Sequence, residues 1–375
     1  MDFDFSEDQE SLRDAVRRWV DKGFSFERRH AIAKAGGKTR DVYRELAGLG
    51  LAGLAIPDTH GGMGFGAVEA MVVGEELGRG LVNAPFAAGA LVAPTLLSAA
   101  PDALQAEWLP KIADASALVV LAHQERGARY HLNVVKTKAA QAGGRWTLSG
   151  AKSIVPAGDE ADAFIVPARI SGADDAAAGI GLFVVDAKAA EVRGYPTQDG
   201  ARAAEVVFDQ AAATLITEDG FATLERAVDV GIAAHCAEAV GVMDKLVAMT
   251  VEYMNTRKQF GVTLATFQAL RHRIADVKMQ LELGRSMSYY ASLKLGEAAP
   301  QRRRALSQAR VQLGQSMRFV GQQCVQLHGG IGVTDEYAGS HYFKRLTVLE
   351  MGYGDTMHHL GEVSRRMQDS AGVFA

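Results

Sequence analysis

The chain has 375 residues, and its 40 Lys and Arg side chains against 44 Asp and Glu give a net charge of −4. Proteins that bind nucleic acid through its phosphates need a basic surface, so this mildly acidic balance argues against a nucleic-acid partner. The length is sufficient for two or three domains.

The cysteines and the N-terminal segment favour a reducing compartment. Cys236 and Cys324 are the two cysteines of the chain, too few for a disulfide framework. The first eight residues are acidic, whereas a secretory signal begins with basic residues and continues as an apolar run. We therefore expect a cytoplasmic protein.

Helical patterns dominate the first third of the chain. Ser6 and Gln9 have the spacing of a capping box, and apolar residues follow at helical intervals, so a helix is expected to begin there. Further helices are expected over about 40–49, 67–79 and 102–114. The first domain is therefore predicted to be all-helical and to span residues 1–115.

Residues 81–101 carry no charge over a length that could cross a membrane. Asn83, Pro85 and Pro94 interrupt this stretch, and many of its residues are Ala or Gly. We expect two buried helical segments around a proline and no membrane span.

The pattern changes twice after residue 115. Over 116–217, short β-rich runs alternate with Gly, Asp and Ala turns, and Gly143-Gly144 is placed like the corner of a hairpin. From 218 to 375 the helical pattern returns, with long apolar stripes over 221–257, 264–295 and 302–327. Long helices of this kind pack as a bundle. The sequence therefore predicts a middle β-domain and a C-terminal helix bundle.

Two segments carry most of the chemical information. Arg257-Lys258-Gln259-Phe260-Gly261 closes the first long helix and is followed by Phe267-Gln268. Basic residues and a glycine are common at a helix C-terminus. An Arg with amide side chains and an aromatic ring nearby also fits an anionic, ring-bearing ligand. Gln326-Leu327-His328-Gly329-Gly330-Ile331-Gly332 is the second segment, either a plain helix-ending loop or a backbone that a ligand can approach closely.

Together the two segments resemble the paired FAD-contacting motifs of the acyl-CoA dehydrogenase family. Gly61-Gly62-Met63-Gly64 and Glu75-Glu76-Leu77-Gly78-Arg79 extend the likeness to the N-terminal part. Within the family the chain looks most similar to bacterial small subunits of the pimeloyl-CoA dehydrogenase type. The implied fold is α+β but mainly α, with an N-terminal helical domain, a middle β-barrel-like domain and a C-terminal four-helix bundle.

The resemblance also implies a reaction and a set of partners. In the family a carboxylate removes the α-proton of an acyl-CoA thioester while the β-hydride passes to FAD, which gives a trans-2-enoyl-CoA. Electrons then leave to an electron-transfer flavoprotein, and the subunits assemble into oligomers. The residues assigned to the pyrophosphate and adenine end of FAD, held mainly by a neighbouring subunit, are Arg257, Gln259, Phe260, Gln268, Gln326, Gly329 and Gly330.

The sequence departs from the family at the flavin ring and at the catalytic base. The Thr-Glu-Pro run that bonds the ring aligns with residues 124–131, and the Trp-Ile-Thr strand aligns with Ile154-Val155-Pro156, which has neither ring nor hydroxyl. The two positions where family members carry the base fall on Tyr353 and Gly231. Asp355 lies two residues from the first position and Asp229 two residues from the second. Asp355 is the candidate base, and a turn or helix-cap role is the alternative for it.

Three hypotheses follow. The chain is a self-sufficient FAD-dependent acyl-CoA dehydrogenase with a displaced base such as Asp355. Alternatively, it is a base-deficient subunit that supports FAD and catalysis on a partner dehydrogenase subunit. A flavin-free acyl-CoA-binding or structural paralogue is the third and least favoured. His341, His358 and His359 lack the spacing of known metal motifs, so we expect no metal.

Overall fold

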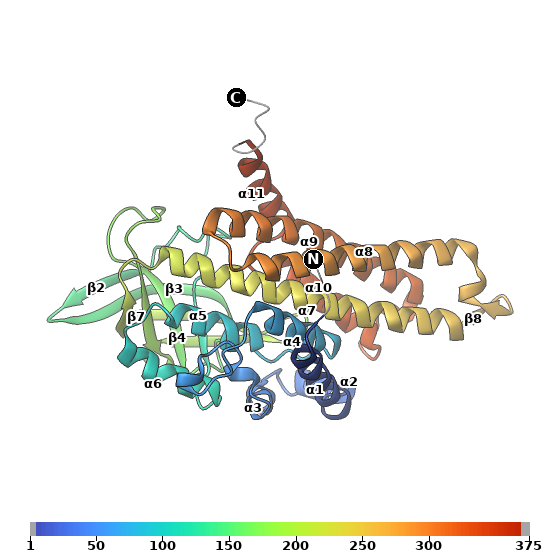
Figure 1. Cartoon of the computed structure of the whole chain (residues 1–375), viewed down its shortest axis with the longest axis horizontal. Coiled ribbons are helices and arrows are strands. Elements are labelled where there is room, and N and C mark those ends of the chain that lie inside the picture. The colour runs from blue at the N-terminus through green and yellow to red at the C-terminus, as the bar shows by residue number, and fades with distance from the viewer. Residues whose placement is uncertain (1–4, 369–375) are drawn as a thin grey trace. The chain divides into compact units, whose positions relative to one another are not determined.

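The computed structural model describes residues 5–368. In the N-terminal part the helices are α1 (Glu7–Gly23), α2 (Phe26–Lys34), α3 (Arg40–Gly48), α4 (Ala67–Arg79), α5 (Ala93–Leu97) and α6 (Asp102–Ala113) (Figure 1). The predicted capping box is confirmed. The backbone N–H of Gln9 donates to Ser6 Oγ at 3.2 Å, and that of Ser6 donates to Gln9 Oε1 at 3.0 Å.

The uncharged stretch 81–101 forms the predicted buried helical segments. A π-helix over Phe86–Val92 leads directly into α5, and most of its residues are buried. Pro94 lies in the first turn of α5, where its missing N–H has no helical partner to lose. Among the described residues, no helix is both long and apolar enough to cross a membrane.

The strands of the middle part form one large sheet. They are β1 (Val119–Leu121), β2 (Lys138–Ala142), β3 (Arg145–Pro156), β4 (Ala163–Arg169), β5 (Ile180–Asp186), β6 (Glu191–Pro196) and β7 (Arg202–Thr217). The order is β1-β4-β2-β3-β7-β5, and β5 pairs back onto β4, which closes the sheet as a barrel-like domain requires. Gly143 and Gly144, both at positive φ, turn β2 into β3 as predicted.

Long helices make up the C-terminal part: α7 (Phe221–Thr256), α8 (Gln268–Lys294), α9 (Ala299–His328), α10 (Ala338–Met351) and α11 (Thr356–Gln368). Met243 of α7 touches the Gly284 position of α8, and Asp244 pairs with Arg285 at 2.9 Å, so these two helices run side by side (Figure 1). The predicted helical, sheet and helical architecture is confirmed.

Contacts divide the chain into two compact units. The helical unit contains the segments up to Ala31, Ala67–Val82 and from Ile232 onward. The sheet unit contains Ile32–Gly66 and Asn83–Gly231. Within the helical unit, α4 and α7 approach each other closely at Gly78. A Cβ there would lie 2.1 Å from the carbonyl oxygen of Glu238, so only glycine fits. Within the sheet unit, the core is built from the inward side chains of β1, β3, β4, β5 and β7 together with Tyr43 and Ala52.

Candidate functional site

Tyr353, the first position where the resemblance implies a catalytic Glu, lies in the turn between α10 and α11. Its backbone is left-handed, with φ of 57°. The ring of His235, from α7, packs against the Tyr353 ring with centroids 4.9 Å apart. Gly352 permits this contact, because a Cβ there would lie 2.6 Å from His235. An aromatic pair therefore occupies this position, at a backbone conformation that costs on the order of 1–3 kcal/mol.

Arg310 of α9 holds this turn in place. Its side chain is buried, and a guanidinium group can only donate hydrogen bonds. Nη2 of Arg310 lies 2.9 Å from each of four carbonyl oxygens, those of Leu349, Glu350, Gly352 and Gly354. The two hydrogens of Nη2 are shared among these carbonyl oxygens, which lie at and just after the C-terminal end of α10, where the helix dipole also favours positive charge.

Burial and nearby arginines make His235 and Tyr353 poor proton acceptors. Burial lowers the pKa of His235 well below its usual range, and Arg345 and Arg310 lower it further. Burial raises the pKa of Tyr353 to about 12. A general base works best when its pKa lies near the working pH. Neither side chain is therefore matched to the removal of a carbon-bound proton near neutral pH.

The two carboxylates nearest to Tyr353 in the sequence both serve the start of α11. Asp355 Oδ1 accepts a hydrogen bond of 2.8 Å from the backbone N–H of His358, which is the geometry of a helix N-cap. Glu350 Oε1 accepts from the backbone N–H and the hydroxyl of Thr356, at 3.0 and 2.7 Å. The structure thus gives Asp355 a capping role. Gly231, the second base position, lies within α7 and supplies no side chain.

The segment 257–263 forms a hairpin in the helical unit. Strands β8 (Lys258–Gln259) and β9 (Val262–Thr263) pair, and Phe260 and Gly261 between them have φ of 53° and 83°. Two successive positive φ values are typical of a type I′ hairpin turn. Gly261 therefore closes a hairpin, and the interpretation of this glycine as a helix cap is wrong, because α7 already ends at Thr256.

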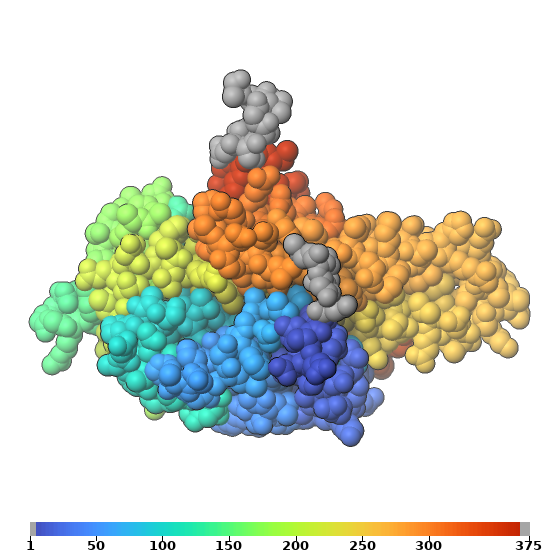
Figure 2. Space-filling view, in the orientation of Figure 1, coloured from blue at the N-terminus to red at the C-terminus, as the bar shows by residue number. Residues whose placement is uncertain are grey.

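This hairpin lies between the end of α7 and the start of α8 and is open to solvent (Figure 2). Arg257, Gln259 and Gln268 are exposed, and the side chain of Phe260 is 92% exposed. Phe260 contacts Phe267 edge to face, with centroids 6.2 Å apart. A guanidinium, amide groups and an aromatic face are thus displayed together for a partner or a ligand.

The second motif lies at the end of α9. Gly329 has φ of 66° and ψ of −145°, a conformation essentially restricted to glycine. A Cβ at Gly329 or Gly330 would meet no atom within 4 Å, so the backbone there faces open space. The ring of His328 packs on Tyr253, one turn before Arg257, with centroids 4.7 Å apart. The fold thus brings the end of α7, which carries the first motif, against the end of α9, which carries the second.

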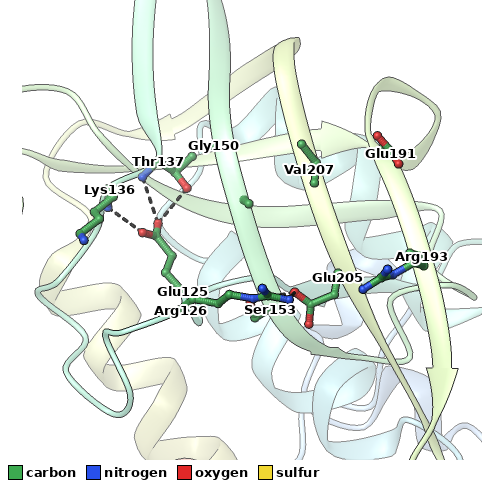
Figure 3. Close-up of a pocket in the computed structure, with 11 residues that line it drawn as sticks. Glu125, Arg126, Lys136, Thr137, Gly150, Ser153, Glu191, Arg193, Glu205 and Val207 are labelled. Carbon is green, nitrogen blue, oxygen red and sulfur yellow. Dashed lines mark hydrogen bonds and ion pairs between the residues drawn. The ribbon is translucent and has the colours of Figure 1, made fainter.

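In the sheet unit, Glu125 and Arg126 of the 124–131 segment and Ser153, which precedes Ile154, line part of a cavity of about 540 Å³ (Figure 3). Glu125 lies at its edge and accepts hydrogen bonds from the backbone N–H groups of Lys136 and Thr137, at 2.8 and 3.0 Å, and from Lys152 at 2.7 Å. Burial alone would raise the pKa of Glu125, but Lys152 and these hydrogen bonds hold it below its usual value. Glu125 is therefore ionised and fixes the 124–131 loop to β3.

Across the same cavity, Glu205 of β7 accepts hydrogen bonds from Ser153 at 3.0 Å and from the Tyr195 hydroxyl at 3.2 Å (Figure 3 labels Ser153 and Glu205). Ile154, at the Trp position, has φ of 54° and is 52% exposed. Such a conformation is an outlier for a β-branched residue. Because β3 and β7 shift register between Lys152 and Val155, the strand is irregular in the segment that the resemblance aligns with the family's flavin-ring strand.

Three domain models match the chain: the acyl-CoA dehydrogenase N-terminal domain over 6–116, the middle domain over 121–211 and the C-terminal domain over 218–368. The chain therefore belongs to the acyl-CoA dehydrogenase family, whose members are FAD-dependent oxidoreductases. It is 27% identical over 379 residues to the pig mitochondrial long-chain specific acyl-CoA dehydrogenase, covering 96% of this chain and 86% of that one.

Solved structures agree in fold over almost the whole length. A variant of the Tcur3481–Tcur3483 steroid ACAD is 28% identical, with a TM-score of 0.87 over 98% of this chain and 99% of that chain. The glutaryl-coenzyme A dehydrogenase complex with glutaryl-CoA has a TM-score of 0.91 at 21% identity, over 100% and 97%. The ChsE4–ChsE5 complex of Mycobacterium tuberculosis has a TM-score of 0.88 at 24% identity, over 99% and 100%.

Proposed function

We propose that this chain is a subunit of an FAD-dependent acyl-CoA dehydrogenase that converts an acyl-CoA thioester to a trans-2-enoyl-CoA and passes electrons to an electron-transfer flavoprotein. The observation that carries the subunit role is the contrast between the residues for the nucleotide end of FAD and the position of the catalytic base. The nucleotide-end residues are present and accessible, whereas the base position holds Tyr353 packed on His235. The base is accordingly supplied by a partner dehydrogenase subunit.

The nucleotide end of FAD fits the residues at the ends of α7 and α9. Arg257 offers a guanidinium fork for the pyrophosphate, Gln259, Gln268 and Gln326 offer amides, and Phe260 offers a ring face. Gly329 and Gly330 leave the backbone free to approach. When bound, FAD supplies the acceptor for the β-hydride. The flavin-ring end fits less well, because Ile154 and Pro156 provide neither the ring nor the hydroxyl of the family motif.

Exposed apolar side chains on α11 support an oligomer. Met357 is 71% exposed, Leu360 45% and Met367 54%. Leu360 also borders a groove of about 470 Å³ between α8, α9 and α11, which Met287 and Val311 line as well. Exposed apolar side chains beside an apolar groove are a feature of protein interfaces. A dehydrogenase subunit that covers α11 would bury these side chains.

The cap geometry allows Asp355 to be tested as a base without disturbing the fold. Asn caps helices as well as Asp but cannot accept the α-proton, whereas Ala removes the cap and costs about 1 kcal/mol. We expect Asp355→Asn to retain the turnover of the assembled enzyme within about twofold, and Asp355→Ala to lower thermal stability.

Turnover of the assembled enzyme and its unfolding temperature are the two measurements. If Asp355→Asn folds with wild-type stability but loses turnover by several orders of magnitude, the self-sufficient enzyme with Asp355 as base replaces the present proposal.

Three further assignments belong to the same proposal. The domains span 1–115, 116–217 and 218–375, the location is cytoplasmic, and the subtype is that of the small subunits of pimeloyl-CoA dehydrogenase. The small-subunit subtype would point to dicarboxylyl-CoA substrates.

A further inference from the structure

The loop that follows the second motif is held by side chains from two other helices. Asp335 lies in this loop, between the Gly329–Val333 turn and α10. Its carbonyl oxygen is 2.8 Å from Nε2 of His341 in α10. Its carboxylate lies 3.7 Å from His30 of α2 and 3.4 Å from Lys344 of α10. One loop residue is thus fixed through both its backbone and its side chain.

Arg29 determines the protonation state in which His341 can make these contacts. Nη1 of Arg29 lies 2.5 Å from Nδ1 of His341, and Arg29 is only 3% exposed. Since a guanidinium can only donate, Nδ1 must accept, and the ring proton must sit on Nε2. Nε2 then donates to the carbonyl oxygen of Asp335, and the ring is neutral. Burial lowers the pKa of His341, and Arg29 and Lys344 add to this, although the Asp335 contacts oppose it.

The same geometry argues against a metal site. The ligand atoms of His30, Asp335 and His341 lie within 4.8 Å of one another, which is a spacing that a metal ion could use. However, the Nε2 lone pair of His341 is replaced by a proton in the tautomer that Arg29 selects. Arg29 and Lys344 also place two cations beside the group. We call the group of Arg29, His30, Asp335, His341 and Lys344 the clamp, because its hydrogen bonds and ion pairs hold the loop at Asp335.

The clamp acts on the loop that carries the second motif. Tyr337, two residues after Asp335, connects the loop back to the end of α9, because its hydroxyl lies 2.8 Å from Nε2 of His328. Nδ1 of His328 in turn lies 2.8 Å from the Cys324 carbonyl oxygen. Tyr253 packs on the same His328 ring. Movement of Asp335 would therefore be transmitted to the glycines between His328 and the clamp.

We infer that His341, oriented by Arg29, is a positioning residue that holds loop 329–337 in place for the nucleotide end of FAD. This role rests on the proposed function only for the identity of the ligand. The charged and titratable groups that face His341 are Arg29 and His30 from α2, Asp335 from the loop and Lys344 from α10. Protonation of His341 removes the acceptor at Nδ1 and places a positive ring beside the Arg29 guanidinium. The resulting repulsion releases the clamp.

The test measures amide hydrogen exchange of residues 331–337 in the full-length chain, corrected for intrinsic rates. It compares exchange at about one pH unit above the ordinary histidine pKa of about 6.5 with exchange at pH values stepped down through and well below it, because the pKa of His341 is lowered. We expect exchange about tenfold faster at the lowest pH in the wild type. His341→Gln keeps a donor and an acceptor but cannot ionise, so it should exchange slowly at every pH. His341→Lys carries a permanent charge and should exchange fast at every pH.

His30→Gln is the matched control, because it alters the other imidazole at Asp335 and should keep the wild-type response. The inference is overturned if His341→Gln retains the pH response, if His341→Lys exchanges slowly at every pH, or if His30→Gln abolishes the response. FAD release from the assembled enzyme, followed by fluorescence, should be slow in His341→Gln and fast in His341→Lys, as amide exchange is. Because exchange needs no cofactor, failure of FAD binding would contradict the proposed function and leave the clamp result standing.

Discussion

Replacing Arg310 with Met is expected to destabilise the helical unit by about 3 kcal/mol or more. The substitution keeps an unbranched side chain of similar length but removes the donor that four carbonyl oxygens share. The Leu349 carbonyl keeps the backbone N–H of Gly352 at 3.2 Å, whereas each of the other carbonyl groups left without a partner costs roughly 1 kcal/mol or more. The left-handed backbone of Tyr353 would also lose the contacts that hold it.

Arg318→Gln provides the matched control for this prediction. Arg318 lies on the same helix, but its side chain is 64% exposed and its contact with Glu350 is 3.7 Å long. Exposed pairs of this kind contribute about 0–1 kcal/mol. Urea unfolding followed by circular dichroism compares the two variants. Equal stability of Arg310→Met and Arg318→Gln would show that the carbonyl contacts of Arg310 do not hold the turn.

Replacing Arg257 with Ala is expected to weaken FAD retention in the assembled enzyme by about tenfold to a hundredfold, since a hydrogen bond to a charged group contributes about 1.5–3 kcal/mol. Arg257 is exposed at the start of the β8–β9 hairpin, so the substitution should leave the fold intact. The measurement is the fluorescence of FAD released during dilution.

Lys258→Ala removes the same charge one residue further along. Gln259 and Lys258 follow one another in β8, so their side chains point to opposite faces. Lys258→Ala should therefore change FAD retention by less than about threefold. If FAD retention falls equally in both variants, Arg257 acts only through general electrostatic attraction. If FAD retention is unchanged in Arg257→Ala, Arg257 is not part of the site.

Local patterns predicted the elements of this fold well. The Ser6 and Gln9 capping box, the Gly143-Gly144 hairpin and the long C-terminal helices all depend on neighbouring residues, and all are confirmed. The sequence alone does not predict the role of Gly261, because a glycine after basic residues fits both a helix cap and a hairpin turn, and only the paired strands β8 and β9 distinguish them.

The contacts that define the candidate site join distant parts of the sequence. His235 meets Tyr353, and Arg310 reaches carbonyl groups some forty residues further along the chain. Neither contact has a periodicity or a motif that would reveal it. Two signals were nevertheless available for the Asp355 cap. Thr356 opens a helical run directly after this Asp, and the backbone donor of His358 follows at the third position.

The most direct test of the central claim is anaerobic mixing of the chain, supplied with FAD, with an acyl-CoA thioester, with flavin bleaching as the readout. The chain should be measured alone and after assembly with a dehydrogenase subunit that carries the catalytic Glu. The account predicts no bleaching by the chain alone, because Tyr353 and Gly231 supply no carboxylate. It predicts rapid bleaching by the assembly. Rapid bleaching by the chain alone would contradict the account.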